Sequence, residues 1–161
     1  TLFVTMFGIG KLKPIPGTFG SLATVIILYF LFHKFEISSN LILLGLVVIF
    51  IYSFSAVTSH TKDKDNKDPG EIVIDEFIGQ SIPIYLYEIS HRTNKDSNEA
   101  LIFYAVCFIL FRYFDIMKPF PVSYFDKKHK NSFGVIMDDV CAGLYVVLSL
   151  ICFMVLKSYI L

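Results

Sequence analysis

Four apolar runs restrict what this sequence can fold into more than any other feature. They cover residues 22–32, 41–57, 100–111 and 140–156. A helix that crosses a lipid bilayer needs about 20 residues, with a lower limit near 17, so the second and fourth runs are long enough by themselves. The first qualifies only if residues 18–22 and His33 lie in the interface, and the third can extend through Tyr113 and Phe114. Because hydrophobic residues make up 55% of the 161-residue chain, the sequence predicts membrane-spanning helices.

A fifth, weaker apolar run covers residues 77–89 and contains Gln80 and Pro83. It is too short for an ordinary span, so it predicts either a re-entrant helix or a helix buried in protein. Strand-like alternation does not recur along the chain. We therefore expect a single membrane-embedded domain over residues 1–161, an all-α integral membrane bundle of four to five apolar helices. Residues 1–20 lack the pattern of a cleavable signal peptide, and we expect none there.

The polar segments between these runs are predicted to share one side of the membrane. If successive runs pair as hairpins, residues 1–20, 58–76 and 112–139 emerge on a common face. Four basic residues lie on the other face, and ten lie on the common face: Lys11, Lys13, Lys62, Lys64, Lys67, Arg112, Lys118, Lys127, Lys128 and Lys130. Basic residues concentrate in cytoplasmic loops, so we expect the common face, with any active-site loops, in the cytoplasm.

A glycine- and proline-rich segment, residues 8–21, precedes the first apolar run and includes Lys11. Backbone N–H groups at a helix N-terminus, together with a lysine, can cradle a phosphate. We expect Thr18 or Ser21 to cap the helix, and Lys11, Thr18 and Ser21 to bind substrate. The spacing is not that of a P-loop, and an ordinary turn entering a membrane helix is the alternative.

Two adjacent acidic pairs, Asp75-Glu76 and Asp138-Asp139, stand where apolar stretches begin. One carboxylate at such a place is commonly a helix N-terminal acid favoured by the helix dipole. Two together cost more to desolvate and indicate a cation between them. Upstream, the charged run 62–68 reads as a solvated loop, and only Asp68 at its end is left open as a site residue.

Between the two pairs, Arg112, Asp115 and Lys118 are spaced three residues apart. On a helix that continues to Pro119 they would share one face. This stripe is either structural salt bridging or a site for a phosphate ester, in which Arg makes bidentate contacts and Lys supplies a point charge.

Taken together, these acids would repel one another strongly without a cation. Magnesium prefers oxygen ligands, can polarise a phosphoryl oxygen and can lower the pKa of an attacking water. We therefore predict a Mg²⁺ site at Asp75, Glu76, Asp138 and Asp139, and a catalytic group that adds Asp115 and His60. His60 would be a general acid, and the alternative is a surface histidine.

Four motifs resemble those of the phosphatidylglycerophosphatase A family, in the family's order. They are residues 13–22 (KPIPGTFGSL), 68–76 (DPGEIVIDE), 111–121 (FRYFDIMKPFP) and 134–143 (GVIMDDVCAG). The resemblance implies a Mg²⁺-dependent enzyme of the bacterial inner membrane that hydrolyses phosphatidylglycerophosphate to phosphatidylglycerol and phosphate. The chain departs from the family pattern at Ile15, where a small residue is common, and at Asn131-Ser132, where glycines are frequent.

Several alternatives stay open at this stage. The sequence shows no obvious protein nucleophile, so we expect attack by a metal-activated water, with an aspartyl-phosphate intermediate as the alternative. A membrane ion or metal transporter using the same acids is a rival function, and a non-enzymatic membrane subunit is another. The formal net charge of zero argues against nucleic acid as a partner. Metal count, lipid selectivity and oligomeric state do not follow from the sequence.

Overall fold

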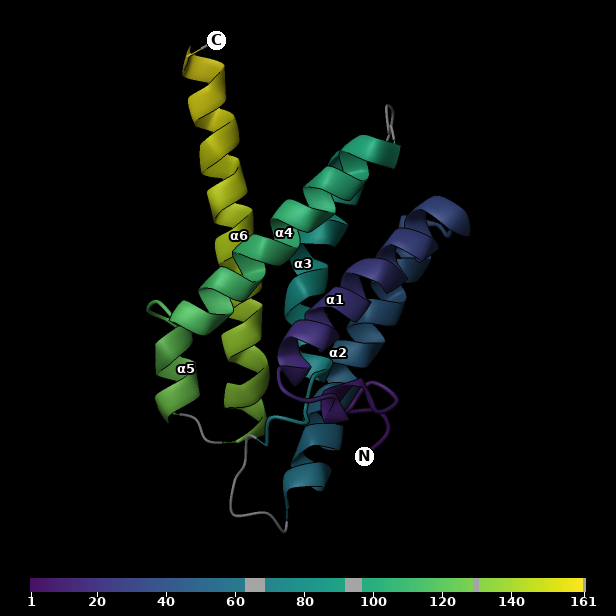
Figure 1. The fold of residues 1–161 in the computed structure, drawn as a ribbon, viewed down its shortest axis with the longest axis vertical. Coiled ribbons are helices and arrows are strands. Elements are labelled where there is room, and N and C mark those ends of the chain that lie inside the picture. Colours follow the sequence, from purple (N-terminus) through teal and green to yellow (C-terminus); the bar gives the residue numbers. More distant parts are fainter. Residues whose placement is uncertain (63–68, 92–96, 129–130, 161) are drawn as a thin grey trace.

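The computed structural model describes residues 1–62, 69–91, 97–128 and 131–160, and the regular structure in these ranges is entirely helical (Figure 1). The elements in chain order are η1 (Ile9–Lys11), α1 (Pro16–Tyr29), its π-helical extension η2 (Phe30–Lys34), α2 (Ser39–Thr61), α3 (Ile74–Ser90), α4 (Ser97–Met117), α5 (Val122–Lys128) and α6 (Ser132–Ile160).

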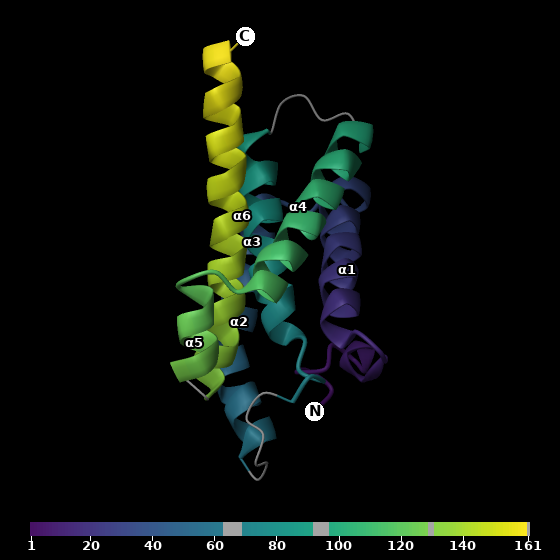
Figure 2. The same cartoon turned by 60° about the vertical axis from the view of Figure 1, so that its left-hand side comes forward.

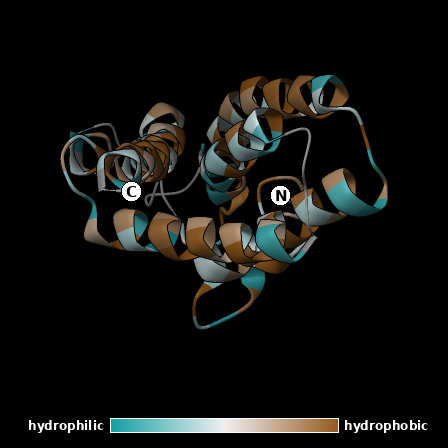
Figure 3. Cartoon of the chain, turned by 90° about the horizontal axis from the view of Figure 1, so that it is seen from above, coloured by the Kyte–Doolittle hydropathy of each residue, from teal (hydrophilic) through white to brown (hydrophobic). Residues whose placement is uncertain are grey.

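Four of these helical segments are long and apolar enough to cross a membrane: Pro16–Lys34, Ser39–Thr61, Asn98–Met117 and Ser132–Tyr159. Each contains one of the four apolar runs, and hydrophobic residues predominate along the helices (Figure 3). Many large apolar side chains on these helices are exposed on the protein's own surface, as a lipid-facing surface requires. The prediction of an all-α membrane bundle with four to five apolar helices is confirmed.

The weaker fifth run forms α3, which lies inside the bundle. Most of its side chains are buried, and it packs against α6, α1, α2 and α4. At 1.5 Å per residue its 17 residues extend about 26 Å, less than the hydrocarbon thickness of a typical bilayer. Of the two predicted alternatives, the structure has the protein-buried helix.

The polar segments gather at one end of the bundle, as the hairpin arrangement predicts. The N-terminal segment, the end of α2, the start of α3 and α5 lie at this end, and the C-terminus of α6 lies at the opposite end (Figures 1 and 2). Several basic residues counted from the sequence lie outside the described residues: Lys64, Lys67, Arg92, Lys95 and Lys130.

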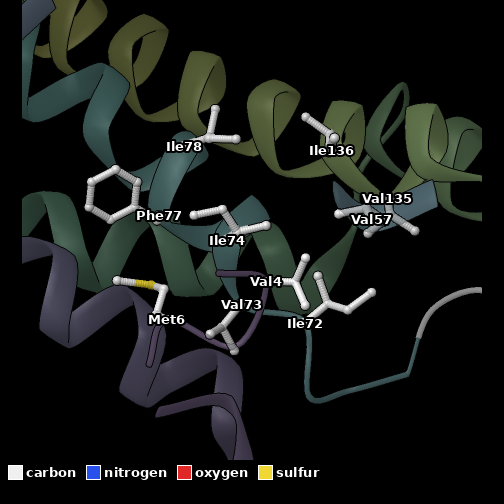
Figure 4. Packing of buried hydrophobic residues seen from close by; sticks show 10 residues of the cluster. All are labelled: Val4, Met6, Val57, Ile72, Val73, Ile74, Phe77, Ile78, Val135 and Ile136. Carbon is white, nitrogen blue, oxygen red and sulfur yellow. The ribbon is translucent and has the colours of Figure 1, made fainter. Parts of the chain in front are cut away.

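A cluster of buried apolar side chains fixes the start of α3 (Figure 4). Val73, just before the helix, donates its backbone N–H to the carbonyl of Val4 at 2.9 Å, which ties the N-terminal segment to α3. Ile74 and Phe77 pack in the same cluster with Ile136 of α6. Because these anchors flank Asp75 and Glu76, the cluster sets where the two carboxylates lie.

Candidate active site

A cavity of about 390 Å³ opens at the end of the bundle where the polar segments meet. Its wall is built from the start of α1, the first turn of α3, the last turn of α4, the residues just after it, and the second turn of α6. The charged residues that line it are Asp75, Glu76, Arg112, Asp115, Lys118, Asp138 and Asp139. The structure therefore brings together the five acids of the predicted catalytic group, Asp75, Glu76, Asp115, Asp138 and Asp139, with both cations of the third motif.

The cavity has more negative than positive side chains. Five carboxyl groups face two cationic groups, an excess of three negative charges if all are ionised. Asp75, Glu76 and Asp139 form the tightest group, in which one carboxylate oxygen from each lies within 4.8 Å of the others. Oxygen donors at this spacing suit a hard divalent cation.

Close backbone packing between α3 and α6 brings these three acids together. Gly79 and Gly143 face each other at the crossing, and a Cβ on Gly143 would collide with the carbonyl oxygen of Gly79. A Cβ on Gly79 would likewise collide with the carbonyl oxygen of Asp139. Small residues let membrane helices approach this closely, so the two glycines place Asp139 beside Asp75.

Two buried carboxylate oxygens in this group, Oε2 of Glu76 and Oδ1 of Asp139, have no hydrogen-bond partner among the described residues. Burial, followed by the nearby Asp75 and Asp115 carboxyls, raises the pKa of Glu76 well above its usual range, and Arg112 only partly opposes this. Buried polar atoms nearly always have a partner. A bound cation would supply one here, so the donor set fits a metal ion.

Arg112, near the end of α4, is held on the opposite wall. Its Nη1 donates to Oδ2 of Asp115 at 2.8 Å and to Oγ of Ser21 at 3.3 Å. Gly17 of α1 leaves room for this arrangement, because a Cβ there would collide with Oε1 of Glu76 and lie 3.4 Å from Nη1 of Arg112. The guanidinium is thereby fixed beside the acidic group.

Lys118 reaches the cavity because α4 ends just before it. Its φ of 44° is left-handed, which is uncommon for a residue other than glycine. Its Nζ lies 3.0 Å from Oδ2 of Asp138. The predicted single stripe of Arg112, Asp115 and Lys118 is therefore only partly helical, and Asp138 pairs with Lys118 instead of joining the three-acid group.

At the start of α1 the structure differs from the expected capping. Pro16 occupies the first turn and Ile15 is the N-cap residue, with no side-chain cap. Thr18 and Ser21 lie inside the helix, and Ser21 donates to the carbonyl of Gly17 at 2.9 Å. The capping prediction is wrong because proline's fixed φ already starts the helix. Thr18 nevertheless lines the cavity.

Two predicted site residues lie elsewhere. His60, in the last turn of α2, bonds Oε1 of Glu71 at 3.0 Å and lines a different cavity, beside Phe3 and Tyr52. Lys11 is exposed at the end of η1 and does not line the acidic cavity. Asp68 lies outside the described residues.

Sequence reasoning did not find the glycines that make the site possible. A Cβ on Gly79 or Gly143 would collide with the backbone of the facing helix, and a Cβ on Gly17 would collide with the side chain of Glu76. Glycine within an apolar helix is a signal of close backbone approach, and it would have identified Gly79 and Gly143.

Comparison with known proteins gives consistent matches over nearly the whole chain. The sequence profile of the family described as phosphatidylglycerophosphatase A matches residues 2–154. A phosphatidylglycerophosphatase A of Haemophilus influenzae is 37% identical over 91% of this chain and 83% of its own length. The Escherichia coli protein of the same name is 32% identical over 88% of this chain and 76% of its own length.

A third relative, from Bacteroides thetaiotaomicron, is provisionally named a phosphatidylinositol-3-phosphatase. It is 33% identical over 89% of this chain and 86% of its own length. No solved structure matches the chain.

Proposed function

The chain belongs to the phosphatidylglycerophosphatase A family and is a phosphoric monoester hydrolase, and from this premise we propose that it hydrolyses phosphatidylglycerophosphate with the aid of Mg²⁺. The observation that supports this most is the cavity in which the buried carboxylates of Asp75 and Asp139 and the partly buried Glu76 share the wall with an arginine and a lysine. It offers oxygen ligands for a divalent cation and positive groups for a phosphate in one place.

In this proposal Asp75, Glu76 and Asp139 would hold the cation, which when bound would polarise the phosphoryl group and lower the pKa of a water. We propose that Asp138, whose carboxylate accepts from Lys118, positions that lysine. Its role as a fourth metal ligand stays a prediction. Lys118 and Arg112 face the cavity and bind the phosphate oxygens.

The remaining polar residues orient these groups. Asp115 and Ser21 both contact Nη1 of Arg112, so the guanidinium keeps one direction without substrate. Preorganised charge of this kind lowers the barrier because nothing needs to reorient during the reaction. None of the described residues that line this cavity is a cysteine, a serine or a histidine, and we favour direct attack by water over an aspartyl-phosphate intermediate.

The location of the cavity fits a lipid substrate. Bacterial relatives and four apolar helices indicate a bacterial membrane protein. We propose that it is a multi-pass protein of the inner membrane with the cavity on the cytoplasmic side, where the basic residues concentrate. Ile15 and Ile116 line the cavity and are exposed, so its mouth combines apolar and charged groups as a phospholipid does.

We favour hydrolysis over ion transport, the rival expectation from the sequence. Transport sites usually lie near the middle of the membrane, whereas this acidic group lies at the end of the bundle.

The direct test is phosphate release from phosphatidylglycerophosphate by the purified chain in detergent, with Mg²⁺ and with EDTA. We expect release with Mg²⁺, which EDTA abolishes and added Mg²⁺ restores. Phosphatidylinositol 3-phosphate, offered in the same micelles, tests the headgroup, since one relative carries that name. A folded sample that releases phosphate from neither lipid, with or without Mg²⁺, would contradict the proposal.

A further inference from the structure

Gln80 is a fully buried polar residue of α3 that the proposed chemistry does not use. Its side chain is 0% exposed. It follows Glu76 by four residues, so both lie on the same face of the helix, with Gln80 one turn deeper in the bundle. The face carrying Glu76 is the one that meets Gly17 of α1 and Arg112 of α4.

Several small buried polar side chains in the bundle bond to their own helices. Thr24 and Ser81 each donate to the backbone carbonyl four residues earlier, at 2.8 and 2.6 Å. Gln80 differs, since neither Oε1 nor Nε2 has a hydrogen-bond partner within the part of the chain that the structure describes. A buried amide with both atoms unpaired is rare, because desolvation is then uncompensated.

The adjacent end of the cavity holds two further buried atoms in the same state. Oε2 of Glu76, an acceptor, and Nε of Arg112, a donor, are also unpartnered among the described residues. The amide of Gln80 carries one group that donates and one that accepts. Its Nε2 is therefore suited to the acceptor Oε2 of Glu76, and its Oε1 to the donor Nε of Arg112.

We propose that Gln80 is a positioning residue for the active site: through buried water, its Nε2 is linked to the carboxylate of Glu76 and its Oε1 to the guanidinium of Arg112, since the side-chain atoms concerned have no direct partner among the described residues. This rests on the proposed function, because Glu76 is a proposed metal ligand and Arg112 a proposed phosphate ligand. Partners that orient a metal ligand typically change metal affinity by about 10–100-fold when they are removed.

A role in packing alone makes the opposite prediction. An unpartnered buried amide destabilises the fold, so an apolar side chain of the same length would fit the site at least as well. Gln80→Met is that substitution. If Gln80 only fills space, the variant is as stable and as active as the natural chain.

The experiment compares the natural chain, Gln80→Met and a matched control, Ser81→Ala. Ser81 is the next residue, is 2% exposed, and lines an apolar groove toward α2 instead of the acidic cavity. Binding of Mn²⁺, which prefers the same oxygen ligands as Mg²⁺, is followed by electron paramagnetic resonance in detergent. Thermal unfolding, kcat and KM for the lipid are measured on the same samples.

We expect Gln80→Met to keep its unfolding temperature, to bind Mn²⁺ about 10–100-fold more weakly, and to lose kcat with KM little changed, because Gln80 does not line the cavity. Ser81→Ala should bind Mn²⁺ like the natural chain. Unchanged Mn²⁺ affinity and kcat in Gln80→Met would overturn the role of Gln80 alone. A natural chain that neither binds Mn²⁺ nor releases phosphate would overturn the proposed function with it. If Gln80→Met does not fold, Gln80→Leu is judged by the same criteria.

Discussion

The acids at the two ends of α3 have opposite surroundings. At the first turn, Asp75 and Glu76 face Asp139 within 4.8 Å. Near the last turn, Glu88 has a side chain with 0% exposure, and its Oε1 pairs with Nε2 of His33 at 3.0 Å and accepts from the hydroxyl of Tyr104 at 2.9 Å. The carboxylates at the first turn face other carboxylates, whereas the carboxylate of Glu88 faces hydrogen-bond donors.

The Glu88 group is arranged as a structural tie. His33 comes from the π-helical end of α1 and Tyr104 from α4, so one carboxylate joins three helical segments. Tyr29 stacks on the His33 ring at 4.9 Å, which fixes the imidazole. The acidic cavity has no comparable match, since carboxyl groups outnumber cations there. The difference shows that burial of an acid is not by itself a sign of function, whereas burial against other acids indicates a ligand.

The largest expected loss of activity comes from removing one negative charge from the acidic cavity. Asp139→Asn should lower phosphate release by more than about 100-fold, because residues that only support a metal ligand already account for about 10–100-fold. The unfolding temperature should stay the same or rise, since one like charge leaves a crowded group. Lipid hydrolysis and thermal unfolding of the same detergent sample measure both. Retention of hydrolysis in this variant would remove Asp139 from the proposed metal site.

A substitution at Glu88, at the other end of α3, should lower stability and leave catalysis unchanged. Glu88→Gln replaces a charged acceptor by a neutral amide and should destabilise the fold by about 1–3 kcal/mol, with kcat of the folded fraction unchanged. Denaturant unfolding followed by tyrosine fluorescence gives the stability. If Glu88→Gln abolished turnover in fully folded protein, the two ends of α3 would not differ in the way described here.

A smaller effect should follow from Lys118, the more exposed of the two cations that line the acidic cavity. Lys118→Met removes the point charge proposed to meet phosphate and leaves Asp138 without that partner. Since a hydrogen bond to a charged group contributes about 1.5–3 kcal/mol, we expect KM to rise roughly tenfold or more, with a smaller fall in kcat. Initial rates over a range of lipid mole fractions separate the two. A collapse of kcat at unchanged KM would assign Lys118 to the transition state instead of to binding.

Hydropathy predicts the membrane helices well, but not where the last one begins. The apolar run 140–156 places Asp138 and Asp139 at a helix start, whereas α6 begins at Ser132 and both acids lie in its second turn. The start is fixed by Asn131, whose side-chain oxygen accepts from the backbone N–H of Gly134 at 3.0 Å. Asparagine is a favoured N-cap residue, so this local signal was in the sequence but is weaker than the hydropathy contrast.

The composition of the site was also predictable, since adjacent acids beside apolar helices are costly without a ligand. Which of these side chains pair with one another was not predictable. Whether Asp138 faces a metal or Lys118 depends on the left-handed backbone at Lys118. The meeting of Asp75 with Asp139 depends on contact between Gly79 and Gly143, which are far apart in the sequence. Such pairings are set by tertiary packing, which short-range spacing does not encode.

Substitution of His60 should have the smallest effect on activity. His60 belongs neither to the acidic cavity nor to the group around Glu88. The sequence suggests a general acid, but the ring bonds Glu71 and lines a cavity with residues of the N-terminal segment. A general acid must lie within hydrogen-bond reach of the group it protonates. His60→Ala should therefore leave kcat and its pH dependence unchanged and lower stability by about 1 kcal/mol, through the lost bond to Glu71. Steady-state rates from pH 5 to 9 provide the measurement, with Glu71→Gln as the matched control for the same bond. A loss of kcat in His60→Ala that Glu71→Gln does not share would return His60 to the catalytic group and would require the two cavities to communicate during turnover.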